Sequence, residues 1–304
     1  MSSISVVIPT YNRAALLPRA VHSAFAQTHA PDEVVIIDDG SQDETPAVID
    51  RLKAEFGERL RSVRQTNRGE AGARNAGVRA AKGDLIAFLD SDDVWFPEKL
   101  ERQLVLFTDD VVLTFTGYVW DEAGTERPIL VNEWRSDAAW VINRFLESCC
   151  ITPSTTIVRR AALDAAGPFD EAMRVSCDWD MWCRIVAAGF KTAYLPELTA
   201  RYFWHDLNMS RDSLKTSDAA LYIFTKLFNR QDLPASVNAL KRKGLARWNM
   251  IHAENCLAAG ARNDARRHIV RAALSHPTSV RPGWLRIFLQ SFGSEGGSPE
   301  RVAS

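Results

Sequence analysis

Long apolar segments are missing from this sequence. No stretch of its 304 residues holds the ~18 consecutive apolar residues that a membrane-spanning helix needs. The opening residues, MSSISVVIPTYNR, lack the basic start and the cleavage site of a signal peptide and enter a strand-like pattern at once. On these absences we expect a cytoplasmic protein.

Paired cysteines and two common phosphate-binding motifs are missing as well. The five cysteines are an odd number without a C-x-x-C pair, which argues against a disulfide framework and a structural zinc site and predicts reduced thiols. There is no G-x-G-x-x-G fingerprint and no G-x-x-x-x-G-K-[ST] loop. Hydride transfer and ATP hydrolysis therefore lose support.

Charge is present but unevenly distributed. The composition, with 46% hydrophobic and 25% charged residues, is ordinary for a globular protein, and the net charge is −1. Residues 211–304 hold 15 Lys and Arg against 7 Asp and Glu, a balance of +8, so the first 210 residues carry −9. The basic part could meet phosphates or an anionic membrane, but it lacks the interleaved basic and aromatic residues of a nucleic-acid module. We expect no nucleic-acid partner.

Strand-like and helical patterns alternate in the first part of the chain. The expected strands are 4–11, 32–41, 60–66 and 85–93, and the expected helices are 14–27, 46–57 and 69–83. Continuous β-branched runs between helices predict an α/β fold, with βαβ units around a mostly parallel sheet. Ligands of such sheets bind at the carboxyl ends of the strands.

Beyond residue 110 the alternation loosens, and from about residue 212 the pattern is purely helical. The runs 111–124, 152–160 and 191–205 predict strands of a mixed sheet, whereas 236–260 and 261–277 predict helices. The end, GSEGGSPERVAS, is rich in Gly and Ser. We therefore divide the chain into a domain of residues 1–210, a helical region of residues 211–290 and a disordered tail of residues 291–304.

Three carboxylates gather where the apolar run 86–89 ends. Asp90, Asp92 and Asp93 follow that run with only Ser91 among them. Close carboxylates raise each other's pKa, so such a cluster is disfavoured unless a cation lies among them. Capping of the next helix is the alternative, but Pro97 fits the first helical position, which leaves the acids upstream of the cap.

Four segments resemble, in order and spacing, the family 2 glycosyltransferases, inverting nucleotide-sugar enzymes with the glycosyltransferase-A fold. The segments are VVIPTYNR, VVIIDDGSQDET, NRGEAGARNAGVRAAKGDLIAFLDSDD and GPFDEAMRVSCDWDMWCRIVAAG. The resemblance spans roughly residues 3–206. It implies a Rossmann-like domain with a mixed, mainly parallel central sheet, followed by the C-terminal helical region.

The resemblance gives the acidic cluster a role. Asp90, Ser91 and Asp92 are similar to the family's D-x-D motif, which holds a dication together with the donor's diphosphate. Mn²⁺ and Mg²⁺ prefer oxygen ligands and often combine one or two carboxylates with substrate phosphates. Asp92 is the surest ligand, and Asp90 contacts the ribose, the metal or both. His205 corresponds to a histidine that approaches the metal or diphosphate in many members; a surface histidine is the alternative.

The resemblance also places the nucleotide. In the family, the residue matching Asp39 accepts a hydrogen bond from the base, and a carboxylate suits the imide N–H of uracil or the amino face of guanine. We prefer uracil. Tyr11, just after Pro9 and Thr10, is placed to lie flat against the base, although it could be a core aromatic residue.

Two arginines lie in the glycine-rich segment 67–77. Small residues let a ligand approach the backbone, so Arg68 or Arg74 can pair with the diphosphate. A turn with surface arginines is the alternative.

The catalytic candidate is Asp178. The family usually has Glu-Asp before an aromatic residue, and the aspartate is the general base. Here Cys177 replaces the glutamate and Asp178 matches the base, whereas Asp180 is the less favoured alternative. The loss of the glutamate could remove a contact that orients donor or acceptor.

The resemblance implies a metal-dependent enzyme of the hexosyltransferase class. It would move a sugar from a nucleotide sugar, preferably a UDP-sugar, to a hydroxyl of a carbohydrate or lipid-linked acceptor in bacterial polysaccharide or glycolipid synthesis. The alternatives are a sugar nucleotidyltransferase, which would want a Lys- and Gly-rich triphosphate loop, and a degenerate scaffold protein. The basic C-terminal helices, with Trp284, Leu285, Ile287 and Phe288, either rest on the inner face of a membrane or pack on the catalytic domain.

Overall fold

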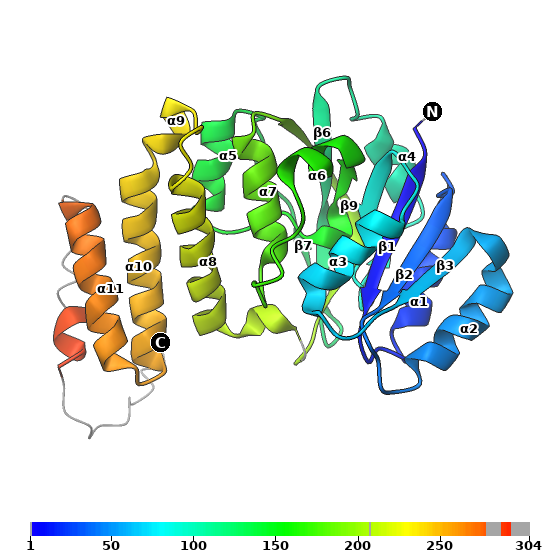
Figure 1. The fold of residues 1–304 in the computed structure, drawn as a ribbon, viewed down its shortest axis with the longest axis horizontal. Coiled ribbons are helices and arrows are strands. Elements are labelled where there is room, and N and C mark those ends of the chain that lie inside the picture. The colour runs from blue at the N-terminus through cyan, green and yellow to red at the C-terminus, as the bar shows by residue number, and fades with distance from the viewer. Residues whose placement is uncertain (1, 207, 278–286, 293–304) are drawn as a thin grey trace. The chain divides into compact units, whose positions relative to one another are not determined.

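The computed structural model describes the chain except residues 1, 207, 278–286 and 293–304. The chain folds into two compact units, most of whose helices and strands are labelled in Figure 1. The first comprises Met1–Arg211 and Arg230–Asn238, and the second comprises Asp212–Asn229 and Ala239–Ser304. Trp284, Leu285 and most of the expected disordered tail lie outside the described residues.

A nine-stranded sheet forms the centre of the first unit. The strands are β1 (Ile4–Thr10), β2 (Glu33–Asp38), β3 (Leu60–Arg64), β4 (Leu85–Phe88), β5 (Val94–Trp95), β6 (Val111–Glu122), β7 (Thr125–Ile129), β8 (Ile157–Arg159) and β9 (Lys191–Trp204). Their order is β3-β2-β1-β4-β8-β6-β9-β5, with β7 paired to β6. The pairs β3-β2, β2-β1, β1-β4 and β6-β9 are parallel and the others antiparallel. The expected mixed sheet with a parallel N-terminal half is thus confirmed.

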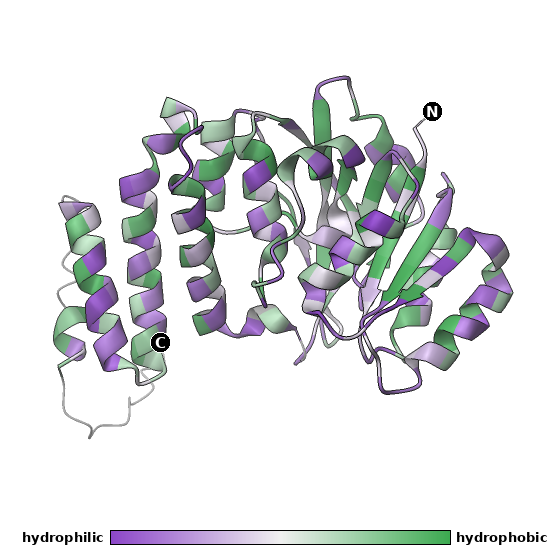
Figure 2. Ribbon diagram, in the orientation of Figure 1, coloured by the Kyte–Doolittle hydropathy of each residue, from purple (hydrophilic) through white to green (hydrophobic). Residues whose placement is uncertain are grey.

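Helices cover both faces of the parallel half. The helices of the first unit are α1 (Leu17–Phe25), α2 (Thr45–Phe56), α3 (Gly69–Ala80), α4 (Lys99–Leu104), α5 (Ala138–Phe145), α6 (Arg160–Ala166), α7 (Cys177–Ala187) and α9 (Ala235–Asn238). Alternate residues of a strand point to opposite faces. Val34 and Ile36 pack with α1 and α2, whereas Val35 and Ile37 pack with α3. Figure 2 shows strand β2 as largely hydrophobic.

Helix α3 lies unusually close to β1. A Cβ placed on Gly77 would lie 2.2 Å from Cγ1 of Val7, so only glycine permits this approach. The glycines of segment 67–77 therefore serve the packing of α3 as well as any ligand. This packing fixes the distance between α3 and the carboxyl end of β1.

The helix after the acidic cluster starts later than the sequence predicts. Pro97 and Glu98 form a turn, Glu98 is the N-cap, and α4 begins at Lys99. The cause is a tertiary contact, because the N–H of Phe96 donates to the carbonyl of Thr199 and holds the chain extended there. The acids still lie upstream of the helix.

Helices α8 (Ser213–Phe228), α10 (Lys241–Ala258) and α11 (Arg262–Ser275) make up most of the described part of the second unit, with a short helical segment at 287–290. Its core uses small residues, among them Ala246, Ala253 and Ala272. The helix expected over 236–260 is split, because 235–238 forms α9, which belongs to the first unit and packs on α5. In the described residues, no helix combines the length and apolarity needed to cross a membrane.

Candidate active site

The site lies where the direction of the sheet order reverses. Strand β1 stands between β2 and β4, and the chain runs from β1 outward to β2 and β3 before returning to β4. The carboxyl ends of these parallel strands meet at one edge of the sheet. They bring Tyr11, Asp39 and Asp90 together from three separate segments.

The end of β1 presents one aromatic side chain to solvent. Tyr11 is 42% exposed, so it is not a core aromatic residue. Thr10 is buried and its carbonyl accepts the N–H of Asp39, while Pro9 is half-buried. The exposed ring leaves the stacking role available, and that role stays a prediction.

Asp39 caps the start of α3. Its Oδ1 accepts the N–H of Arg68 (2.9 Å) and its Oδ2 accepts the N–H of Gly69 (2.8 Å), at the start of α3. Oδ1 also accepts from Gln65 Nε2 (2.7 Å). Helix starts leave unpaired N–H groups that a carboxylate can satisfy.

Asp92 faces a histidine and an arginine from distant segments. Its Oδ2 lies 3.0 Å from Nε2 of His205 and 3.6 Å from Nη2 of Arg13. The backbone carbonyl of Asp92 accepts from Nη2 of Arg19, whose guanidinium stacks 3.8 Å above the ring of Phe203. Burial lowers the pKa of Arg19. Cationic protein groups therefore already stand beside this carboxylate.

Asp93 has a structural role. Its side chain is fully buried, with Oδ2 accepting from the hydroxyl of Ser154 (2.5 Å) and Oδ1 from the N–H of Phe203 (3.1 Å). Burial, followed by the charges of Asp92 and Asp90, raises its pKa well above the ordinary value. Asp93 ties the loop after β4 to β9 and is no ligand candidate.

Arg74 is buried at the centre of this site, where it contacts three side chains, and it is not a surface arginine. Its side chain is 1% exposed, and Nη2 lies 2.5 Å from Oε1 of Glu70 and 2.8 Å from Oδ1 of Asp90. Nη1 donates to Sγ of Cys177 (3.3 Å). Burial acts to lower the pKa of Arg74, but the surrounding anions, Glu70 first, outweigh it and raise that pKa well above normal. In this geometry Arg74 positions Asp90, and its pairing with a diphosphate stays a prediction.

Arg68 is exposed but also paired. Its Nη2 lies 2.6 Å from Oε2 of Glu171, whose Oε1 accepts from Nδ2 of Asn75 (3.0 Å). Asn75 also exchanges two hydrogen bonds with the backbone of Phe169. These contacts fasten the loop before α7 onto α3, so they set the position of Asp178 relative to Asp90.

The two aspartates of α7 differ in their partners. Asp180 is buried, and its Oδ2 is 2.8 Å from Nε of Arg184. Asp178 is half-buried in the first turn, and burial raises the pKa of its carboxyl, while Arg74 acts to lower it and Asp90 to raise it. A half-buried carboxylate with a raised pKa suits a general base, and this favours Asp178 over Asp180.

Strained backbone flanks two of these residues. Asn12 (φ 52°) follows Tyr11, and Ser176 (φ 60°) precedes Cys177 at the start of α7. Left-handed conformations of residues other than glycine cost energy and gather at functional sites. Their placement here agrees with a site built from the end of β1 and the start of α7.

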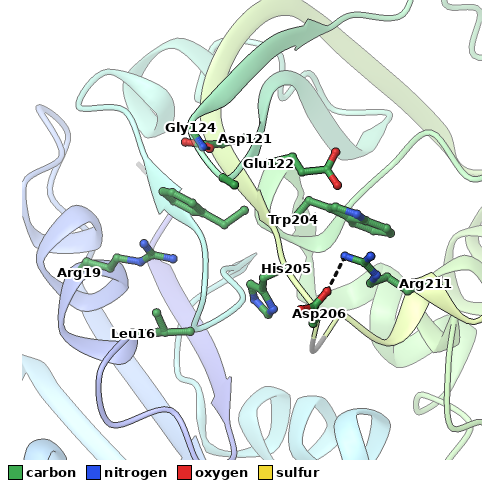
Figure 3. A pocket seen from close by; sticks show the side chains of 11 residues that line it. Leu16, Arg19, Asp121, Glu122, Gly124, Trp204, His205, Asp206 and Arg211 are labelled. Carbon is green, nitrogen blue, oxygen red and sulfur yellow. Dashed lines mark hydrogen bonds and ion pairs between the residues drawn. The ribbon is translucent and has the colours of Figure 1, made fainter.

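A pocket of about 640 Å³ is lined by His205, whose Nε2 faces Asp92 (Figure 3). Arg19 reaches in from α1, while Trp204 and His205 come from the end of β9. The turn between β6 and β7 and the ion pair of Arg211 with Asp206 (3.1 Å) complete its wall. The pocket therefore lies next to the contact between His205 and Asp92.

The pair formed by Asp92 and His205 fits a dication that takes its other ligands from a substrate. Asp92 and His205 offer an oxygen and a nitrogen, donors that Mn²⁺ accepts. Across the described residues, no group of three or more His, Cys, Asp or Glu side chains is placed to hold a metal ion. Asp90 is turned toward Arg74 instead. A site with two protein ligands is complete only with phosphates and water, as is common for Mg²⁺.

Comparisons with known proteins decide the family. The model described as Glycosyl transferase family 2 matches residues 5–166, more than half of the chain. The chain belongs to glycosyl transferase family 2. An uncharacterized glycosyltransferase of Nostoc sp. is 37% identical over 67% of this chain and 66% of its own length, slightly less than two thirds. The Escherichia coli UDP-Glc:alpha-D-GlcNAc-diphosphoundecaprenol beta-1,3-glucosyltransferase WfaP is 28% identical over 71% of this chain and 82% of its own.

Solved structures confirm the glycosyltransferase-A fold of this family 2 chain. The crystal structure of S. aureus TarS in complex with UDP-GlcNAc aligns with a TM-score of 0.71 at 19% identity, over 95% of this chain and 88% of that one. A mannosyltransferase from Pyrobaculum calidifontis, in complex with GDP-Man and Mn²⁺, aligns with a TM-score of 0.64 at 17% identity, over 95% and 84%. Identities this low establish the fold alone.

Sequence reasoning missed several residues of the site. Arg13 lies in the loop before α1 and Arg19 lies on α1, both beside Asp92, and Glu70 lies on α3 against Arg74. Charged residues just after a strand that ends at the site were a usable signal for Arg13. The four-residue spacing of Glu70 and Arg74 within the expected helix 69–83 was a usable signal for their ion pair, whereas the contact of Arg74 with Cys177 depends on the tertiary packing of α3 against α7.

Proposed function

We propose that this protein transfers a sugar from a nucleoside-diphosphate sugar, preferably a UDP-sugar, to an acceptor hydroxyl with inversion at the anomeric carbon. The observation that carries the proposal is the grouping around one buried guanidinium. Arg74 pairs with Asp90 at the end of β4 and acts electrostatically on Asp178 at the start of α7. Asp90, which is expected to meet the donor, and Asp178, the candidate base, therefore interact with the same guanidinium.

Asp178 is the proposed general base. It takes the proton of the acceptor hydroxyl as that oxygen bonds to the anomeric carbon and the bond from that carbon to the diphosphate breaks. Burial keeps the pKa of Asp178 above that of a free aspartate, which improves proton transfer near neutral pH. Asp90, held by Arg74, and Ser91, which is buried beside it, are proposed to orient the donor's ribose and sugar.

Asp92 and His205 are proposed to hold Mn²⁺ or Mg²⁺ with the donor's diphosphate. When bound, such an ion stabilises the negative charge of the departing diphosphate. Arg13 stands beside Asp92 and adds a positive charge at the same place. Tyr11 and Asp39 are proposed to meet the base, Tyr11 with its exposed ring and Asp39 from the start of α3.

The nature of the acceptor is part of the proposal. The E. coli relative is named for a UDP-glucose donor and a diphosphoundecaprenol-linked acceptor. By that likeness we propose a carbohydrate or lipid-linked acceptor in polysaccharide or glycolipid synthesis, and a cytoplasmic location. Contact of the basic C-terminal helices with a membrane is also proposed, since α11 combines Arg267 and Arg271 with the exposed Val270 and Leu274.

A screen of nucleotide sugars tests the proposed function. The protein with Mn²⁺ is incubated with UDP-, GDP- and dTDP-sugars, and release of the nucleoside diphosphate is measured. We expect slow release of UDP from at least one UDP-sugar, and thermal stabilisation by the same compound. Release of pyrophosphate from UTP and a sugar phosphate would instead show a nucleotidyltransferase. Neither release nor stabilisation by any donor would contradict the proposal.

A further inference from the structure

Glu70 and Cys177 contact the two terminal nitrogens of the Arg74 guanidinium. Oε1 of Glu70 lies 2.5 Å from Nη2 of Arg74, and Sγ of Cys177 lies 3.3 Å from Nη1. The second oxygen of Glu70 is 4.0 Å from that sulfur. A carboxylate from α3 thus stands directly beside the position where the resemblance implies a glutamate on α7.

We propose that Glu70 supplies the carboxylate that Cys177 lacks, and that it is a positioning residue for Asp90 and Asp178. This inference rests on the proposed function. It explains how a family 2 chain can replace the glutamate of its Glu-Asp pair with a thiol and still surround Arg74 with negative charge.

Charge balance around Arg74 is the first argument. A guanidinium that is 1% exposed is costly unless anions pair with it. Without Glu70, only Asp90 and Asp178 would remain to balance it, and closer pairing of Arg74 with Asp178 would make that carboxylate a weaker base. Glu70 therefore pairs with Arg74, so that Asp178 does not have to, and Asp178 stays available to the acceptor.

The thiol cannot supply this charge itself. Burial, followed by the charge of Glu70, raises the pKa of Cys177 well above its ordinary value, so the thiol stays protonated at neutral pH. A neutral thiol is a weak hydrogen-bond acceptor for Arg74. The negative charge beside Nη1 and Nη2 must come from another residue, and Glu70 is in place at 2.5 Å from Nη2. Burial raises the pKa of Glu70 to about 7, while Arg74 acts to lower it, so the contact with Arg74 is what favours the charged form of this carboxyl.

Space is the second argument. A glutamate at position 177 would extend two bonds beyond the present position of Sγ, which is enough to bring its carboxylate to Arg74. That space is filled by the carboxylate of Glu70, and Cys177 is itself buried. Either position can carry the carboxylate, whereas both together would crowd two like charges. The small thiol and Glu70 thus form a matched pair.

A swap of the two residues tests the inference. Four variants are compared with the parent protein: Glu70→Ala, Cys177→Glu, the double variant, and Glu58→Ala, an exposed glutamate outside the cluster, as control. kcat and KM for UDP-sugar turnover and the unfolding temperature are measured. We expect each single variant of the pair to lose about 10- to 100-fold in kcat with little change in KM. We expect the double variant to recover to within a few-fold of the parent, where independent effects would multiply.

Several outcomes separate the inference from its premise. A parent protein without turnover contradicts the proposed function, and the unfolding temperature then still tests the pairing, since Glu70→Ala should lower it and the double variant restore it. An active parent whose double variant is no better than Glu70→Ala overturns the inference. Should the double variant fail to fold, Glu70→Asp must keep most of the activity that Glu70→Gln loses; equal activity of these two also overturns it.

Discussion

Among the aspartates of the site, the partner of each carboxylate decides what it can do. Asp93 and Asp180 are buried against a hydroxyl and a guanidinium, and both hold segments of the fold together. Asp92 faces His205 near solvent, and Asp178 lies in a half-buried position with a raised pKa. Identical side chains within a few residues of one another therefore differ: Asp93 and Asp180 stabilise the fold, whereas Asp92 is the proposed metal ligand and Asp178 the proposed base.

Asp178→Asn should separate donor binding from transfer. Asparagine keeps the shape of the side chain but cannot take a proton, so we expect transfer to fall by about 10²- to 10⁴-fold while the donor Kd stays within a few-fold. Turnover of the active UDP-sugar and calorimetric titration of UDP measure the two quantities.

Asp180→Asn is the matched comparison for that variant. It weakens the ion pair with Arg184 and should lower the unfolding temperature more than the rate of transfer. If Asp180→Asn lost transfer while Asp178→Asn kept it, the assignment of the base would be reversed.

Most elements of the first unit follow from local pattern, and the exceptions have tertiary causes. The β-branched runs and the helical patterns between them predicted β1, β2, β4 and α3. The start of α4 and the cap of α3 could not be read, because the bond from Phe96 to Thr199 and the carboxylate of Asp39 act across the chain.

Helices α10 and α11 carry a pH-sensitive contact in the second unit. The rings of His252 and His268 lie 4.5 Å apart, with His252 paired to Ser217 and His268 to Asn249. Burial, followed by the charge of His252, lowers the pKa of His268 to about 4, despite the opposing charge of Asp264. Protonation therefore favours the unfolded unit.

This contact predicts loss of stability in acid. As the pH falls from the ordinary histidine pKa of 6.5 toward 4, the unfolded chain binds a proton that the folded unit resists, so the stability of the second unit falls. Protection factors of amides in α10 and α11, measured at several pH values, should show this. His268→Gln keeps a donor toward Asn249 without titrating and should flatten the dependence, whereas His29→Gln in the first unit should not; an unchanged slope in His268→Gln would contradict the account.

At the scale of the molecule, charge and structure divide the chain at nearly the same place. The charge changes sign near residue 211, and the first unit includes Met1–Arg211. The sequence could not show that Arg230–Asn238 returns to the first unit, since its pattern continues that of the helices around it. The acidic unit carries the candidate site, and the basic unit carries the surface proposed to meet a membrane.

Flotation with liposomes tests that surface. The full chain should float with vesicles that contain anionic lipid and less with neutral vesicles, because Arg267 and Arg271 add charge attraction to the burial of exposed apolar residues of α11. Leu274→Glu should reduce flotation, with Arg79→Glu on the exposed side of α3 as control. Absence of flotation with anionic vesicles would contradict the membrane proposal and leave the catalytic one intact.

The crowded acids after β4 do not by themselves demand a metal ion, because Arg74, Arg13 and His205 already stand among them. The central claim is narrower, namely that Asp92 shares an ion with the donor's diphosphate. Calorimetric titration of UDP into the parent protein and into Asp92→Ala, with and without Mn²⁺, tests it most directly, with Asp50→Ala, an exposed residue of α2, as control. We predict that Mn²⁺ tightens UDP binding at least tenfold in the parent and the control and has no effect in Asp92→Ala. Equal binding of UDP with and without Mn²⁺ in the parent protein would contradict the account.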